Sequence, residues 1–182
     1  MISASELVPR VAAVTGIPHS TVYSVKRRFV ETGVWPSSRG AHVPDLDSHH
    51  LVMLLLALLC DVPAKDASAS ATAYYSLADP NGNKLGEVLK DMIRSFRSIK
   101  GVPSIEAAMA LKSRIDLDCG KPRACITIEC NDGTLETLYG IQSAQWNDLS
   151  VRRSMTISGK CLFDLACGLF FNRWPGDHDV AF

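Results

Sequence analysis

Six hydrogen-bonding side chains stand close together between residues 19 and 27, and their chemistry is that of DNA recognition. They are His19, Ser20, Thr21, Tyr23, Ser24 and Arg27. Such groups form hydrogen bonds with the edges of DNA bases, and an arginine makes a paired contact to guanine O6 and N7. Four neighbouring cations would bind phosphates, which sets position rather than sequence preference. These cations are Arg10, Lys26, Arg28 and Arg39.

Two helices are needed to position these groups, and residues 8–27 have the spacing for such a pair. Ala12 is a small residue on the first helix, Gly16 stands four residues later at the turn, and Val22 and Val25 supply an apolar face on the second. A small residue, a turn glycine and two aliphatic residues at these offsets let short helices cross at close range. That crossing presents the second helix to a DNA major groove.

Through Ala12, Gly16, Ile17, Val22 and Val25, the segment resembles the helix-turn-helix transcription regulators of bacteria and their phages. The match lies within residues 8–30, extends loosely to the polar linker at 37–40, and covers less than a fifth of the chain. The resemblance implies a homodimer that reads two half-sites, about 34 Å apart on a palindromic operator. The expected function is therefore sequence-specific binding of double-stranded DNA in transcription regulation.

The same residues leave two other functions open. A phage-type adaptor for DNA packaging or assembly, similar to a small terminase, would use the same helices but form a larger ring. A protein-interaction module would carry them as a helical hairpin with a solvated basic face and no role in DNA binding. Molecular mass in solution distinguishes a dimer from a ring, and salt-dependent DNA binding distinguishes both from the interaction module.

Charge is unevenly distributed along the chain, although the formal net charge is zero. Residues 1–44 contain five basic and two acidic residues, a net of +3, whereas residues 45–182 contain fourteen basic and seventeen acidic residues, a net of −3. A basic segment on a mildly acidic remainder suits a protein that contacts phosphate only through that segment. We therefore predict a DNA-binding unit with a basic linker at 1–44. Residues 45–182 would form an α+β body that dimerises or binds a protein partner or a ligand.

Catalytic and metal-binding groups lack a recognisable arrangement. The six cysteines form no C-x-x-C pair, and His49 and His50 are adjacent, so they point in different directions on a helix. A nucleophile built from Cys161 or Cys167 with His178 has no third group to orient it. Neither a phosphate-binding loop nor a dinucleotide-binding glycine motif is present. The expectation is a protein that is not an enzyme and uses no cofactor and no metal.

The longest apolar run, Leu51–Cys60, has ten residues, well short of the roughly 20 needed to cross a bilayer. It is better interpreted as a buried helix. The first ten residues lack the pattern of a signal peptide, which favours reduced thiols and a cytoplasmic location without membrane contact.

Periodicity along the chain predicts an α+β fold. It begins with the helix-turn-helix, continues with a helical segment, and ends with a small antiparallel sheet and a C-terminal helix. The first helix should start at a capping box made by Ser3 and Glu6, the second at an N-cap Ser20, and the last at Ser158. Helices are expected at 5–14, 20–30, 45–62, 64–77, 84–99, 104–115 and 160–171, and strands at 124–130, 134–139 and 152–157.

Overall fold

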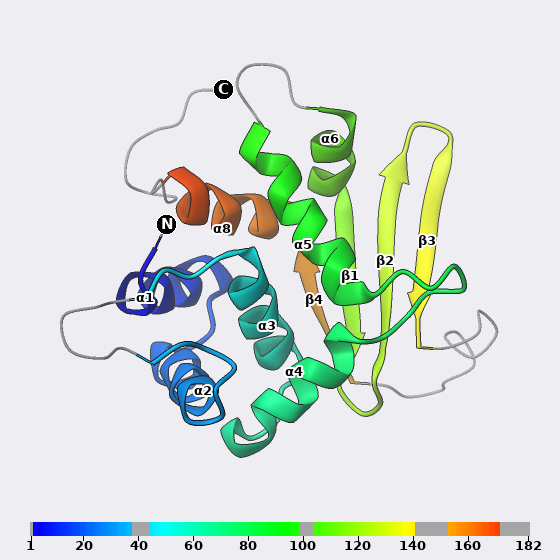
Figure 1. Ribbon diagram of the computed structural model, residues 1–182. Coiled ribbons are helices and arrows are strands. Elements are labelled where there is room, and N and C mark those ends of the chain that lie inside the picture. Colours follow the sequence, from blue (N-terminus) through cyan, green and yellow to red (C-terminus); the bar gives the residue numbers. More distant parts are fainter. Residues whose placement is uncertain (1, 38–43, 99–103, 141–152, 172–182) are drawn as a thin grey trace.

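Helices lie on one side of the molecule and a four-stranded antiparallel sheet lies on the other (Figure 1). This arrangement is seen in a computed structural model, which describes residues 2–37, 44–98, 104–140 and 153–171. The predicted α+β class is confirmed, with helices at the N-terminus and a helix after the last strand.

The N-terminal helix pair consists of α1 (Ala4–Thr15) and α2 (His19–Glu31). The predicted capping box is present: the Glu6 amide donates to the Ser3 hydroxyl, and the Ser3 amide donates to the Glu6 carboxylate at 3.0 Å. Helix α1 ends at Gly16, which has a φ of +71°, and the Gly16 amide donates to the Ala12 carbonyl at 2.9 Å. A left-handed residue at this place is the usual role of glycine in ending a helix.

The start of α2 differs from the prediction. Ser20 is not the N-cap, because the helix begins one residue earlier at His19, directly after Pro18. No side chain caps this end. Pro18 itself is the N-cap, with an extended ψ of 133°, and its side chain has no oxygen that could accept a hydrogen bond from the first amides.

Helix α3 (Ser48–Leu59) is the buried helix predicted from the apolar run. Every residue from 51 to 59 is buried, as expected of a helix that is apolar on all sides. It is shorter than predicted because Asp47 is its N-cap: the His50 amide donates to the Asp47 carboxylate at 3.1 Å. Helix α3 packs against α2, α4 (Ala67–Tyr75) and α5 (Leu85–Ser95).

The remaining helices follow the predicted pattern with one correction. The 3₁₀ turns η1 (Ala64–Asp66) and η2 (Phe96–Ser98) precede α4 and follow α5. Helix α6 (Ile105–Leu111) starts at the cap Ser104 as expected, but it ends before the predicted residue 115. Helix α8 (Gly159–Phe171) begins after Ser158, whose hydroxyl accepts from the Cys161 amide at 3.2 Å.

The sheet has the order β3-β2-β1-β4 and every pairing is antiparallel. Its strands are β1 (Ser113–Asp118), β2 (Arg123–Cys130), β3 (Gly133–Tyr139) and β4 (Ser154–Ser158). Strand β1 was not predicted, since part of its length was assigned to a helix. Aspartate is uncommon in strands, and β1 contains the buried Asp116 and Asp118, which alternate with the core residues Ile115 and Leu117.

One apolar core runs through the described part of the chain. It joins Val11 and Val25 of the helix pair, Leu54 of α3, and Ile115 of the sheet. Helix α1 also contacts α8, and α2 contacts α4 and η1. The predicted N-terminal unit, residues 1–44, and the remainder of the chain therefore contribute to the same hydrophobic core. Among the described residues, no helix is both long and apolar enough to cross a bilayer.

Candidate nucleic-acid interface

Helix α2 has one buried and one exposed face. Val22, Val25 and Phe29 are buried on the inner face. All six residues predicted to read bases are exposed: His19, Ser20, Thr21, Tyr23, Ser24 and Arg27. A turn of helix takes 3.6 residues, so Tyr23 and Arg27 follow one another along the outer face, beside Ser20 and Ser24. His19 and Thr21 are exposed on opposite flanks of the first turn, because side chains two residues apart on a helix point in nearly opposite directions.

Contacts along this surface hold its aromatic side chain. The Tyr23 ring is 50% exposed and stacks on His19, with 6.2 Å between the ring centroids. The Lys26 ammonium lies 5.3 Å from the centre of the same ring. The Ser24 hydroxyl donates to the Ser20 carbonyl at 2.8 Å, so its oxygen lone pairs are left to accept a further hydrogen bond.

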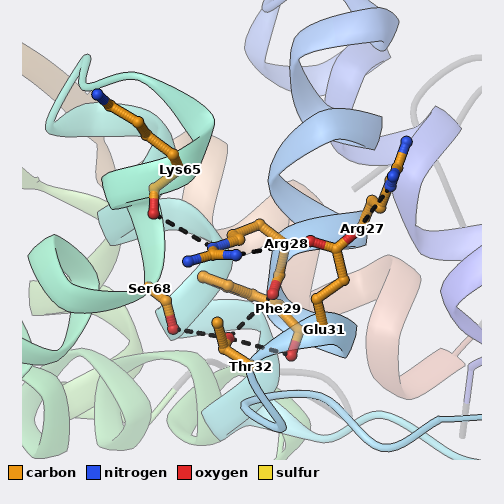
Figure 2. Close-up of polar contacts among 7 residues, drawn as sticks. All are labelled: Arg27, Arg28, Phe29, Glu31, Thr32, Lys65 and Ser68. Atoms are coloured by element: carbon orange, nitrogen blue, oxygen red, sulfur yellow. Dashed lines mark hydrogen bonds and ion pairs between the residues drawn. The ribbon is translucent and has the colours of Figure 1, made fainter.

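Arg27 is engaged by an acidic residue of its own helix. Its Nε donates to Glu31 Oε1 at 2.8 Å, as Figure 2 shows. This hydrogen bond raises the pKa of Arg27 and lowers the pKa of Glu31. Both side chains are exposed, at 74% for Arg27 and 44% for Glu31. Exposed ion pairs contribute little stability, so Arg27 can exchange this partner for another acceptor at small cost.

Arg28 contacts the rest of the chain instead of pointing freely outward. Its Nε donates to the carbonyl of Lys65 in η1 at 3.2 Å, and one terminal nitrogen lies 3.6 Å from Glu31. Beside it, the hydroxyls of Thr32 and Ser68 lie 2.9 Å apart (Figure 2). These contacts join the end of α2 to η1 and α4. The predicted phosphate contact Arg28 thus has an intramolecular partner in this structure.

The other three residues predicted to contact phosphates lie on different segments of the chain. Lys26 lies on α2, next to Tyr23, and is partly exposed. Arg10 lies on α1 and is also partly exposed. Arg39 lies outside the described residues.

Two residues near this surface were missed by sequence reasoning. Glu31 could have been found, because it stands four residues after Arg27 and side chains at that spacing meet on a helix. Lys65 gave no signal, because it stands 37 residues from Arg28 in the sequence and only the tertiary fold brings η1 to α2. Its side chain is exposed and extends away from Arg28 (Figure 2).

The two histidines at the start of α3, His49 and His50, make contacts within the fold. His50 Nδ1 lies 2.6 Å from Asp47 in the cap of α3, and His49 Nδ1 lies 3.3 Å from the Tyr75 hydroxyl. No group of three His, Cys, Asp or Glu side chains that could hold a metal ion is found among the described residues. All six cysteines are free thiols, and Cys130 is the exposed one.

Comparison with known proteins yields no match to a family model, to a curated protein or to a solved structure. A function must therefore be argued from the surface of α2 and its surroundings.

Proposed function

We propose that this protein is a sequence-specific DNA-binding transcription regulator that places α2 in the major groove. The observation that carries the proposal is the concentration of six exposed hydrogen-bonding side chains on a helix whose opposite face is buried. A helix with its side chains is about 10–12 Å across, and the major groove is about 12 Å wide. Helix α2 is anchored to the core through its own buried residues Val22, Val25 and Phe29, so its outer face is free to enter this groove.

Base reading is assigned to the outer face of α2. Arg27 would leave Glu31 and donate to guanine O6 and N7, while Ser20, Thr21 and Ser24 would exchange hydrogen bonds with base edges or phosphates. Tyr23, held by His19 and Lys26, offers an apolar ring surface to a thymine methyl group.

Phosphate binding is assigned to the flanks of α2. Lys26 and Arg10 supply charge. The first amides of α2 have no side-chain cap, and the Pro18 carbonyl accepts from the amides of Thr21 and Val22. Within the described residues no hydrogen bond engages the amides of His19 and Ser20, which would bind a phosphate at the positive end of the helix dipole.

The proposed assembly is a cytoplasmic homodimer held by residues 45–182. One helix pair contacts few base pairs, and a second copy doubles the number of bases read. Two α2 helices about 34 Å apart would then bind the two halves of a palindromic site.

Selection from a randomised duplex pool by the full-length chain tests this function. Enrichment of one palindromic motif is expected, with two chains bound per duplex. The logarithm of affinity should fall linearly with the logarithm of salt concentration. A mass in solution of about twice 19.8 kDa supports the dimer, whereas a larger ring favours the packaging adaptor. Failure of the chain to bind any duplex in a salt-dependent manner would contradict the proposal.

A further inference from the structure

A cavity of about 240 Å³, open to solvent beside the exposed Thr156 and Ser158, lies where the N-terminal helix pair meets the rest of the molecule. Its walls come from four places: the end of α1 and the turn before α2, the inner part of α3, strand β4, and the first turn of α8. Ile17 of the turn and Leu55 of α3 contribute to the walls, as do Met155 of β4 and Cys161 of α8. The cavity therefore lies between the proposed DNA-binding helices and the sheet.

The lining of this cavity carries no charged side chain, and its hydroxyl groups already have partners. Thr15 donates to the Val11 carbonyl at 2.7 Å, Thr156 donates to Asp116, and Ser158 accepts from the Cys161 amide at 3.2 Å. Burial raises the pKa of the Cys161 thiol to about 11, so the thiol is neutral at pH 7. A molecule bound here would meet apolar side chains, the sulfur-containing side chains and the polar groups of Thr15, Thr156 and Ser158, and no charge.

The volume of the cavity and its sulfur-containing lining indicate the class of ligand that fits it. The volume exceeds that of an apolar cavity of about 150 Å³ that holds benzene, and it is below the roughly 300–1,000 Å³ of sites for drug-sized ligands. The thioether of Met155 favours contact with an aromatic ring. We propose that this cavity binds a small, neutral aromatic molecule of one ring or two fused rings.

A ligand in the cavity would affect the position of α2, because it would contact the turn that leads into this helix. Val14, Thr15 and Ile17 precede the exposed face of α2, and Ile17 stands two residues before His19. A ligand that contacts this turn, Leu55 and Met155 together stabilises one placement of α2 relative to the sheet. If the proposed DNA binding holds, on which this step rests, the ligand changes DNA affinity and DNA changes ligand affinity by the same factor.

Titration of the full-length chain with 5-fluoroindole, without DNA, tests the site directly. The fluorine NMR signal of the probe should shift and saturate, with a dissociation constant on the order of 0.1–1 mM for a ligand of this size. Met155→Trp fills the cavity and should weaken binding at least tenfold. Met109→Trp makes the same change on the outer face of α6 and should bind the probe like the parent chain.

Two results would overturn the site: no saturable shift with the parent chain, or equal affinity in Met155→Trp. If Met155→Trp does not fold, Ile17→Phe blocks the cavity from the opposite wall and carries the same expectation. A DNA titration with and without the probe then measures the coupling, for which we expect at least a fivefold change. Saturable probe binding with unchanged DNA affinity would refute the coupling. Absence of DNA binding would refute the proposed function and leave the probe result valid.

Discussion

Arg27 and Glu31 together determine how the outer face of α2 meets an anion. Arg27 is the cation best placed for a paired contact to guanine, yet its Nε is held by Glu31 at 2.8 Å. Glu31 is itself 44% exposed, so its carboxylate would face the phosphates on either side of a groove. A duplex that binds this face must therefore displace the Glu31 carboxylate from the Arg27 guanidinium.

Replacement of Glu31 by Gln should raise affinity for all duplexes about two- to fivefold at 0.1 M salt, because it removes a negative charge and frees Arg27. Fluorescence anisotropy with labelled duplexes measures the change. Asp164→Asn is the matched control, since Lys160 and Asp164 form an exposed ion pair of the same spacing on α8. Unchanged affinity in Glu31→Gln would show that Glu31 does not face the DNA.

Replacement of Arg28 by Ala should lower the free energy of unfolding by about 1 kcal/mol, the usual contribution of one hydrogen bond. The bond lost is that from Arg28 Nε to the Lys65 carbonyl, which joins α2 to η1. Urea denaturation measures the effect, and Lys26→Ala is the control because Lys26 lacks such a partner in η1. Equal stability of Arg28→Ala and the parent chain would show that this hydrogen bond does not stabilise the fold.

At the scale of the elements, the turn between α1 and α2 depends on Gly16. Its φ of +71° disfavours any side chain, and a Cβ placed there would meet no atom within 4 Å. The cost of a substitution is therefore a backbone cost, separate from packing. The turn sets the angle at which α2 leaves α1.

Gly16→Ala should destabilise the chain by about 1 kcal/mol, and Gly16→Asn by less, because asparagine tolerates the left-handed region better than alanine. Thermal unfolding followed by circular dichroism compares the two. If both variants unfold at the parent temperature, the left-handed turn is not required by the fold.

The hairpin from β1 to β2 depends on the buried carboxylate of Asp118. Burial alone would raise the pKa of Asp118, but the Gly120 amide donates to it at 2.8 Å and Arg123 pairs with it, so its pKa lies below the ordinary value. Its stabilising contribution is thus complete above about pH 4 and is lost as the pH falls through the lowered value.

Asp118→Asn should cost about 3–5 kcal/mol at pH 7, because it leaves the buried Arg123 guanidinium without its counter-charge. The difference from the parent chain should become smaller at pH 3, because the unfolded parent chain then holds a proton on this carboxyl that the lowered pKa of the folded state disfavours. Urea denaturation at both pH values checks this. A difference that is the same at pH 3 and pH 7 would contradict the role of the charge.

Sequence patterns predicted elements whose signals are local. The capping box of Ser3, the turn at Gly16 and the buried run of α3 each involve residues within one or two turns of each other. Strand β1 was missed because aspartates are uncommon in strands, and the hydrogen bond from Thr156 to Asp116 joins residues 40 positions apart, which no local pattern reveals. The exposed face of α2 followed from periodicity, whereas the contact of Arg28 with η1 depended on the fold.

At the scale of the whole molecule, the helix pair is integrated with the rest of the chain. Trp35, just after α2, is buried against Phe29 and His50, with ring centroids 5.9 Å and 6.4 Å away. Helix α3 thereby supports α2 from behind, and the cavity beside Ile17 lies along the same junction.

The most direct test of the account is the ratio of affinities for the selected duplex and a scrambled duplex, measured in the parent chain and in Arg27→Ala. If α2 reads bases, this ratio falls roughly 5- to 150-fold in Arg27→Ala, because a paired contact to guanine is lost. Lys160→Ala, which breaks an exposed ion pair of the same spacing on α8, should keep the parent ratio. An Arg27→Ala ratio equal to that of the parent would contradict base reading by α2.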